Sequence, residues 1–237
     1  MTNIIFQYNA SAINEAGLTW LESDIDANAD GAESLFVADM DGDGDLDIVS
    51  ASVFDDTIAW YENDGATEPS WTASDIDTNA DYARSVFVAD MDDDGDLDIV
   101  SASYLDDTIA WYENDGAANP SWTKNVVATS ADGAMQVHVA DMDDDGDLDI
   151  VSASYTDDTI AWYENDGAAN PSWTASDIDT NADGAWRVYV ADMDGDGDLD
   201  IVSQSNLDDT IAWYENDGAA DPSWTAADID TNINGGN

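Results

Sequence analysis

The sequence contains no cysteine and only three basic side chains, Arg84, Lys124 and Arg187, among its 237 residues. Without cysteine, neither a disulfide framework nor thiolate chemistry is available. Without a basic surface, nucleic acid and anionic membranes are excluded as partners, because nothing neutralises their phosphates. No stretch approaches the ~18 consecutive apolar residues of a membrane helix, and the N-terminus does not resemble a secretory signal.

The acidic excess is extreme, with 55 Asp and Glu and a formal charge of -52. Such charge opposes compaction by self-repulsion, so the chain is either disordered or stabilised by a bound cation. Disorder is disfavoured because 43% of the residues are hydrophobic, 10% are aromatic and ten are Trp. A cation that offsets the charge is the remaining expectation.

The chain repeats itself with a constant period. Copies of one acidic segment begin at Asp39, Asp90, Asp141 and Asp192, each 51 residues after the last, and the Trp-Tyr pair that begins at Trp60 recurs with the same step. A fixed period in this range is typical of solenoids, propellers and arrays.

Each repeat contains four predicted strands, because short segments rich in β-branched and aromatic residues alternate with turns of Gly, Pro, Asn and Asp. Four antiparallel strands in about 50 residues is the size of a propeller blade, whereas a β-solenoid usually has a shorter repeat. We therefore expect a single all-β domain over 1–237, a β-propeller of four-stranded antiparallel blades. The predicted blades span 35–77, 86–128, 137–179 and 188–230.

A half blade is predicted ahead of the first full blade, at 4–26. There IIFQYN matches the third strand, IAWYEN, and LTWLESDID matches the fourth, WTASDID. The first two strands of this unit are missing. The simplest closed ring then has five positions, one of them half built; a shorter ring and a partner that fills the gap are the alternatives. An exposed sheet edge there would favour pairing with another chain.

The acidic segment between the first two strands of each blade, here called the Asp loop, has the spacing of a calcium loop. In DMDDDGDLD (90–98), carboxylates stand at positions 1, 3, 5 and 9 and Gly at position 6. The EF-hand calcium loop begins in the same way, with Gly at 6 for the sharp turn. An all-oxygen ligand set with many flexible carboxylates indicates a hard cation and suits Ca²⁺ better than Mg²⁺. A solvated acidic loop without an ion is the alternative.

The pattern DxDxDGxxDIV, followed by IAWYENDG, resembles the FG-GAP/VCBS repeat family, which includes the calcium-binding blades of integrin α-subunits. This resemblance implies a β-propeller, about four Ca²⁺ ions in the Asp loops and an extracellular or cell-surface location. It also implies ligands at loop positions 1, 3, 5, 7 and 9. These are Asp39, Asp41, Asp43, Asp45, Asp47, Asp90, Asp92, Asp94, Asp96, Asp98, Asp141, Asp143, Asp145, Asp147, Asp149, Asp192, Asp194, Asp196, Asp198 and Asp200.

The two ends of each blade differ in how much the repeats vary. The Asp loops and the NDG-containing loops share one end and are nearly constant, whereas the opposite end, here called the variable end, changes from repeat to repeat. Aromatic and Arg side chains on a variable end favour a binding face, with drift in solvent-facing loops as the alternative. The candidate ligand-binding residues are Arg84, Tyr104, Tyr155, Trp186 and Arg187.

Catalysis is not expected, because the chain has no Cys and its one His, His138, replaces an aromatic residue at a strand position. Two binding functions follow. The first is a calcium-binding extracellular recognition or adhesion module that binds a glycan or protein ligand through the variable end, as a lectin does. The second is a structural protein that self-associates through the incomplete N-terminal blade.

Overall fold

The computed structural model describes residues 5–8 and 21–232, and these form eighteen β-strands and no helix. Sheet 1 contains β3 (Ala32–Ala38), β4 (Asp47–Ser52), β5 (Thr57–Asn63) and β6 (Trp71–Asp77). Sheet 2 contains β7 (Ala83–Ala89), β8 (Asp98–Ser103), β9 (Thr108–Asn114) and β10 (Trp122–Ala128). Sheet 3 contains β11 (Ala134–Ala140), β12 (Asp149–Ser154), β13 (Thr159–Asn165) and β14 (Trp173–Asp179). Sheet 4 contains β15 (Ala185–Ala191), β16 (Asp200–Ser205), β17 (Thr210–Asn216) and β18 (Trp224–Asp230).

A two-stranded half-sheet precedes these four sheets. It pairs β1 (Ile5–Tyr8) with β2 (Leu21–Asp24) in antiparallel register. The remainder of the predicted N-terminal unit, residues 4 and 9–20, lies outside the described residues, as do 1–3 and 233–237 of the predicted domain. The described residues contain no helix with the length and apolar character needed to span a bilayer.

All four full sheets are antiparallel meanders, in which each strand pairs with the next along the chain. The second strand of sheets 1 to 3, DIVSAS, is buried along its whole length, because a sheet packs against both of its faces. This explains why it consists of β-branched and small residues without a polar alternation. The predicted all-β class with four-stranded antiparallel repeats is therefore confirmed.

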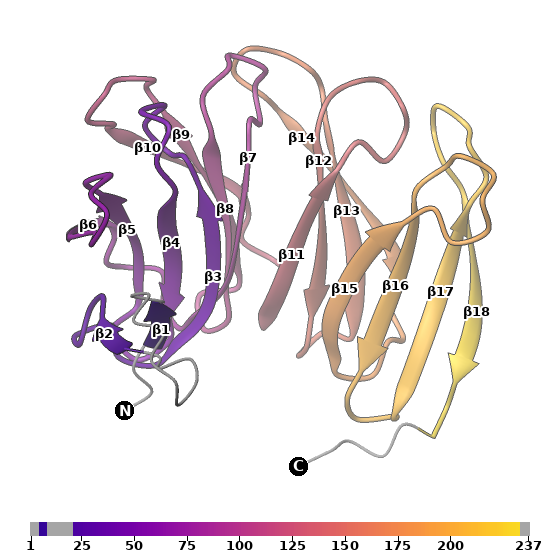
Figure 1. The fold of residues 1–237 in the computed structure, drawn as a ribbon. Coiled ribbons are helices and arrows are strands. Elements are labelled where there is room, and N and C mark those ends of the chain that lie inside the picture. The colour runs from indigo at the N-terminus through magenta and orange to yellow at the C-terminus, as the bar shows by residue number, and fades with distance from the viewer. Residues whose placement is uncertain (1–4, 9–20, 233–237) are drawn as a thin grey trace, which may run out of the picture.

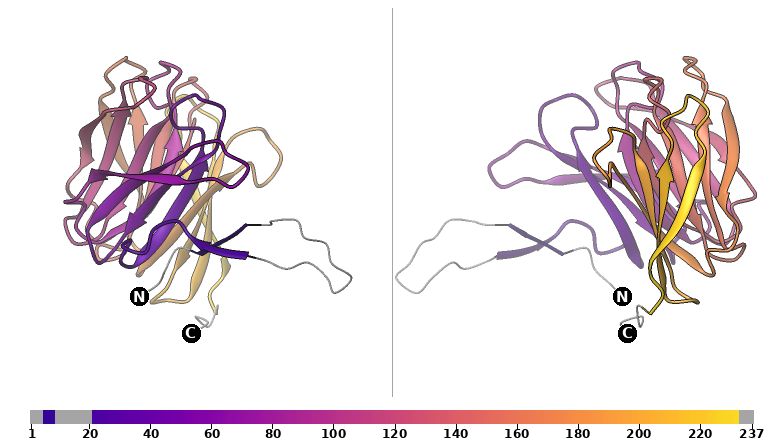
Figure 2. Two further views of the ribbon diagram at one scale, coloured as in Figure 1. Left: turned by 60° about the vertical axis from the view of Figure 1, so that its left-hand side comes forward. Right: turned by 90° about the vertical axis from the view of Figure 1, so that its right-hand side faces the viewer.

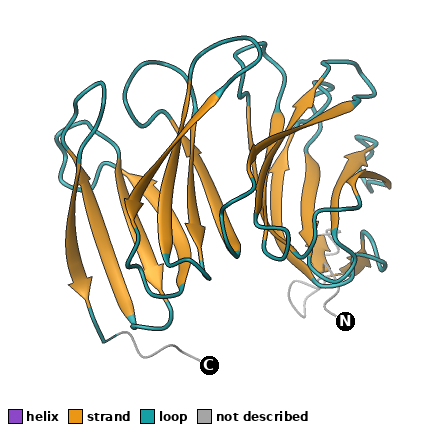
Figure 3. Cartoon of the chain, turned by 180° about the vertical axis from the view of Figure 1, so that it is seen from behind, coloured by secondary structure: helices purple, strands orange, loops and turns teal. Residues whose placement is uncertain are grey.

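The sheets stand side by side along an open arc (Figure 1), with the first strands β3, β7, β11 and β15 packed against one another in that order. The view from behind likewise shows sheets 1 and 4 at opposite ends of the arc, separated by sheets 2 and 3 (Figure 3). The half-sheet lies at the sheet 1 end, as the two turned views show (Figure 2). The described sheets do not close on one another, so the ring of five positions stays a prediction.

Each sheet has a forward face, toward the next sheet in the sequence, and a backward face, toward the preceding one. Between sheets 1 and 2 the forward residues Met40, Val49 and Trp60 form one cluster with the backward residues Val86 and Val88. Equivalent clusters join sheets 2 and 3 and sheets 3 and 4. Trp60, Trp111 and Trp162 are 1–3% exposed, because the repeated Trp of sheets 1 to 3 packs against the following sheet.

Candidate metal sites and the variable end

The Asp loops are shaped by their own backbone amides. In the second loop, Asp90 at position 1 accepts hydrogen bonds from the backbone N–H groups of Asp94 (3.1 Å) and Gly95 (2.9 Å). Gly95 at position 6 has a φ of 98°, a left-handed conformation that glycine adopts at little cost. The same two bonds recur in the first and third loops. The chain thereby turns its side-chain oxygens toward one another.

Three carboxylates converge in every loop, with one oxygen from each lying within 4.8 Å of the others. Positions 1 and 3 belong to all four clusters; the third member is position 5 in loops 1, 3 and 4, and position 9 in loop 2. The clusters are Asp39, Asp41 and Asp43; Asp90, Asp92 and Asp98; Asp141, Asp143 and Asp145; and Asp192, Asp194 and Asp196. These repeated clusters can hold metal ions.

The middle carboxylate of the second cluster fits a cation especially well. Asp92 Oδ1 is buried and no hydrogen-bond donor among the described residues reaches it. Burial, together with repulsion from the neighbouring Asp94, raises the pKa of Asp92 to about 6. In the third loop, Asp143 Oδ1 accepts a hydrogen bond from the backbone N–H of Asp145 (3.3 Å), and burial with repulsion from Asp145 likewise raises the pKa of Asp143 to about 6. A buried carboxylate oxygen without a donor, next to other carboxylates, is stabilised by a positive ion.

The carboxylate at position 9 has a structural task in all four repeats. Asp98 is fully buried and accepts hydrogen bonds from the backbone N–H groups of Met91 (3.1 Å) and Asn114 (2.8 Å). Asp47, Asp149 and Asp200 make the same pair of bonds. Burial raises the pKa of Asp98 to about 7 despite these donors. Position 9 therefore ties the Asp loop to the end of the third strand.

The side chains at position 7 point elsewhere and belong to none of the clusters. Asp45, Asp96, Asp147 and Asp198 each lie against the glycine of the adjacent NDG loop. A Cβ on Gly65, Gly116, Gly167 or Gly218 would overlap the carboxylate of the facing Asp. This close approach accounts for the glycine that all four NDG loops share.

The NDG loops also hold themselves and their neighbours in place. Asn114 donates from Nδ2 to the carbonyl of Leu97 (3.0 Å) in its own sheet and to that of Met40 (3.0 Å) in sheet 1. Asp115 accepts bonds from the backbone N–H and the hydroxyl of Ser121, which closes the loop. The constant end of the molecule is thus a network of paired loops as well as a row of candidate metal sites.

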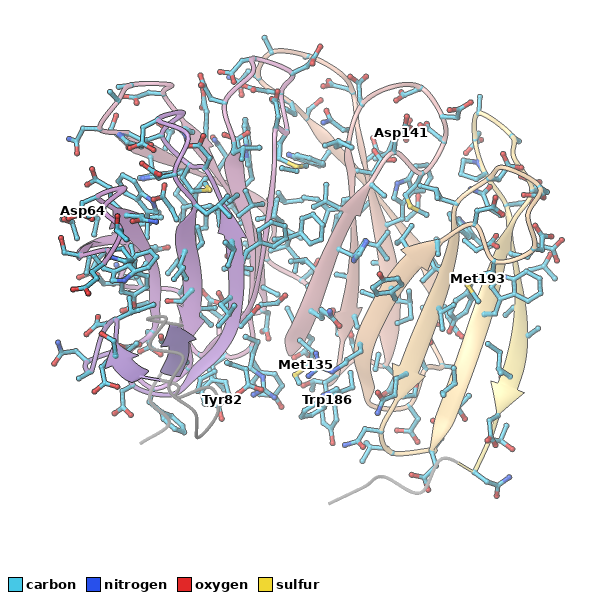
Figure 4. All side chains as sticks on the ribbon, in the orientation of Figure 1. Asp64, Tyr82, Met135, Asp141, Trp186 and Met193 are labelled. Carbon is cyan, nitrogen blue, oxygen red and sulfur yellow. The ribbon has the colours of Figure 1, made fainter. Side chains whose placement is uncertain are left out.

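At the opposite end, aromatic rings form a continuous row, here called the aromatic arc: Phe54, Tyr82, Tyr104, Tyr155 and Trp186. Consecutive ring centroids are 6.1, 5.8, 6.5 and 5.8 Å apart, with tilted or edge-to-face geometry. Tyr82, Met135 and Trp186 lie at one end of the molecule and Asp141 at the other (Figure 4). The predicted ligand residues Tyr104, Tyr155 and Trp186 therefore belong to one surface.

Arg84 lies between two rings of the aromatic arc, Tyr82 and Trp186. Its guanidinium lies 5.5 Å from the ring of Tyr82 and 5.1 Å from that of Trp186, and it forms an ion pair with Glu33 (3.3 Å). Arg187 joins Arg84, Glu33 and Trp186 around a small hollow. All five predicted ligand residues are thus brought to the variable end, although the hollow itself is too small for a drug-sized ligand.

Sequence reasoning missed Tyr82. It has a φ of +61° and occupies the position of Gly31, Gly133 and Gly184 in the other repeats, where φ is also positive. A bulky residue in this conformation is unusual and costs roughly 1–2 kcal/mol. The signal was present in the sequence, since the four copies read NADG, NADY, SADG and NADG. A Tyr in place of a turn glycine marks a side chain that is retained at a cost.

A family model of the FG-GAP-like repeat matches the chain three times, over residues 39–101, 90–152 and 141–203. Together these matches cover more than half of the chain. It belongs to the FG-GAP-like repeat family. Each matched segment runs from one Asp loop to the second strand of the next repeat, so it contains two Asp loops of this FG-GAP-like protein.

Solved structures resemble the FG-GAP-like chain in fold, whereas no curated protein matches its sequence. A protein from Lactobacillus plantarum aligns with a TM-score of 0.59 and 17% identity over 94% of this chain. The periplasmic gluconolactonase PpgL of Pseudomonas aeruginosa aligns with a TM-score of 0.51 and 11% identity over 85%. The V. cholerae biofilm matrix protein Bap1 has a TM-score of 0.44 and 17% identity over 96%. The chain spans 65%, 57% and 42% of their respective lengths.

Proposed function

We propose that this FG-GAP-like protein is a calcium-stabilised recognition module that works outside the cell or at its surface, in adhesion. The observation that carries the proposal is the convergence of three carboxylates in each of four Asp loops. The ligands would be the clustered side chains at positions 1, 3 and 5, with the buried Asp at position 9 closing the loop. When bound, calcium would supply positive charge and fix the loop; it has no chemical step to perform here.

Calcium also offsets part of the charge that opposes folding. Four divalent ions would change the formal charge from -52 to -44, since four times two is eight. The local effect is larger than this change in net charge, because each ion stands among carboxylates that repel one another at close range. Exposed loops with oxygen ligands commonly bind calcium in the range of extracellular concentrations.

Calorimetry tests the calcium sites directly. Titration of calcium into the chelated protein should give about four sites per chain, and chelation should lower the melting temperature sharply. Asp143→Asn should remove one site, whereas Asp75→Asn, an exposed carboxylate on the outer strand β6, should leave the stoichiometry unchanged. An unchanged melting temperature in excess EDTA would contradict the proposal.

Recognition is assigned to the aromatic arc at the variable end, with a glycan as the ligand class. Tyr82, Tyr104, Tyr155 and Trp186 are partly exposed, so their rings offer apolar surface to a sugar while the neighbouring Gln136 and Asn206 offer hydrogen bonds. Arg84 is positioned by Glu33 and the two flanking rings and can donate to sugar hydroxyls. We propose binding rather than catalysis: His138, whose pKa burial lowers, stands between the rings of Phe87 and Tyr189.

A glycan array in the presence of calcium tests this assignment. Binding should be lost in Trp186→Ala and Tyr155→Ala and kept in Val126→Ala, which removes an exposed apolar side chain from the outer strand β10. Circular dichroism should show that all three variants stay folded. A silent array across many glycans would remove the carbohydrate assignment and leave the calcium sites standing.

A further inference from the structure

The forward face of sheet 4 has no neighbour among the described residues. Met193 is 50% exposed, whereas the same residue of the other repeats, Met40, Met91 or Met142, is 1–2% exposed. The four methionines occupy the same position of the Asp loop, and Met193 stands in the same loop sequence as Met40, DMDGDGDLD. Only the presence of a following sheet distinguishes the three that are buried from the one that is not.

The rest of this face is open in the same way. Tyr189 is 65% exposed and Ile229 57%, and Val202, Ile211 and Trp213 are only partly buried. Their counterparts in sheet 1 are Phe36, Ile76, Val49, Ile58 and Trp60, all of which belong to or pack on the cluster between sheets 1 and 2. Sheet 4 therefore presents an apolar surface that the chain covers three times elsewhere.

The backward face of sheet 1 is the complementary half of that interface, and it is also partly open. Leu35 is 44% exposed and Val37 43%, whereas Val86 and Val88, their counterparts in sheet 2, are 5% and 6% exposed. Ile25, which follows β2, packs over Ile48, Ala59 and Tyr61 on β4 and β5, the two middle strands of sheet 1. This contact covers the middle of the face, whereas Leu35 and Val37 on β3 stay partly exposed.

The series of hydrogen bonds that joins neighbouring sheets also stops at sheet 1 and at sheet 4. A hydrogen bond from an Asn side chain to a methionine carbonyl in the Asp loop of the preceding sheet joins each pair of neighbouring sheets. The pairs are Asn114 with Met40, Asn165 with Met91 and Asn216 with Met142. Among the described residues, Asn63 at the start of the series donates from Nδ2 to Leu46 alone, within its own sheet. The carbonyl of Met193, at the end of the series, has no following Asn among the described residues to bind.

We propose that a second copy of the chain covers these surfaces, with sheet 4 of one copy packed against sheet 1 of the next. The interface would repeat the one already present between consecutive sheets, with Met193 and Tyr189 facing Leu35 and Val37, and Asn63 donating to the Met193 carbonyl. Such a head-to-tail contact is heterologous, so it produces a closed ring of copies or an open chain.

Continuity with an interface already present supports a second copy as the partner. Sheet 1 of another copy offers the same kind of face that sheets 2, 3 and 4 present to the sheet before them. Two copies repel through their net charge of -52 each, so association should strengthen as salt screens that repulsion.

Sedimentation velocity with calcium, at low and high salt, measures the association. The wild-type mass should exceed the 25.3 kDa of one chain and should rise with concentration and with salt, unless the ring closes as a stable oligomer of constant mass. A wild-type protein that stays monomeric under all these conditions, as a ring closed within one chain would, overturns the proposal.

Complementation between two variants separates head-to-tail contact from every symmetric pairing. Met193→Asp blocks sheet 4 and Leu35→Asp blocks sheet 1, both at positions already exposed to solvent, so each variant should fold and be monomeric alone. Mixed together, they should form a one-to-one dimer, because one free face of each kind remains. Val126→Asp, at an exposed apolar position on the outer strand β10 of sheet 2, should associate as the wild type does. Failure of the mixture to dimerise, or association of either variant alone, overturns the proposal.

Discussion

Asn114 of sheet 2 donates a hydrogen bond of 3.0 Å to the carbonyl of Met40, which lies 74 residues earlier in the Asp loop of sheet 1. The same side chain also binds Leu97 and accepts a bond from Gly116. One buried amide therefore joins an Asp loop, an NDG loop and the neighbouring sheet. This relationship recurs at each junction and makes the constant end of the molecule a continuous scaffold.

Removing this Asn side chain should lower the free energy of unfolding more in sheet 3 than in sheet 1. Asn165→Ala leaves the buried carbonyls of Met91 and Leu148 without their donor, so we expect a loss of about 2–3 kcal/mol in the free energy of unfolding. Asn63→Ala removes a donor from Leu46 alone and should cost roughly 1 kcal/mol less. Urea unfolding in the presence of calcium measures both, and equal losses would refute the interpretation.

The close approach of the NDG glycine to position 7 predicts a difference between two glycines. Gly116→Ala places a Cβ on the carboxylate of Asp96 in addition to the strain of a φ of 65°. Gly95→Ala has similar strain, about 1–2 kcal/mol, but its Cβ would meet no atom within 4 Å. Thermal unfolding should show the larger loss for Gly116→Ala, and adding Asp96→Ala should recover part of it. Equal losses without recovery would argue against the contact.

Calcium binding should release protons near neutral pH. Burial raises the pKa of Asp98 and of Asp149 to about 7, and burial with carboxylate repulsion raises that of Asp92 and of Asp143 to about 6. Ligands bind metal in their deprotonated form, so calcium affinity should rise with pH between about 6 and 8, with the greatest proton release at the acidic end. Calorimetry at about pH 6 in two buffers of different ionisation enthalpy measures the release; identical heats would contradict it.

The same pKa values determine how the calcium-free protein responds to pH. A carboxyl whose pKa is raised on folding stabilises the folded state fully below its unfolded pKa of 3.8. That contribution is lost as the pH rises through its folded pKa. The calcium-free protein should therefore lose stability between about pH 4 and pH 7, and calcium should restore it above that range. Melting temperatures with and without EDTA across this range provide the measurement.

Replacing Tyr82 by glycine should separate stability from binding. Tyr82→Gly relieves a left-handed conformation that costs about 1–2 kcal/mol, and it removes two ring contacts worth about 0.5–1.5 kcal/mol each. The free energy of unfolding should then change by about 1 kcal/mol or less. Glycan binding should fall because the aromatic arc is interrupted, and Tyr82→Phe should keep it. A large loss of stability with full binding would reverse this assignment.

Several features were predictable because they depend on local chemistry. The Gly at position 6 of each Asp loop adopts the left-handed conformation that a sharp turn needs, and the carboxylates at positions 1 and 3 converge in every loop. Position 7 is a ligand position by resemblance, but its side chains lie outside the clusters. Their direction depends on the NDG loop of the same sheet, which is a contact between segments about 20 residues apart.

The sequence by itself determined the antiparallel four-stranded unit, the 51-residue period and the oxygen-rich loops, because strand pattern, turn residues and ligand spacing all lie within one repeat. Tertiary structure decided what the near-identical repeats could not distinguish. Met193 and Met40 stand in the same loop sequence, DMDGDGDLD, yet Met193 is exposed and Met40 is buried. The difference arises because burial depends on the sheet that packs against a residue, and the last sheet of an open arc has none among the described residues.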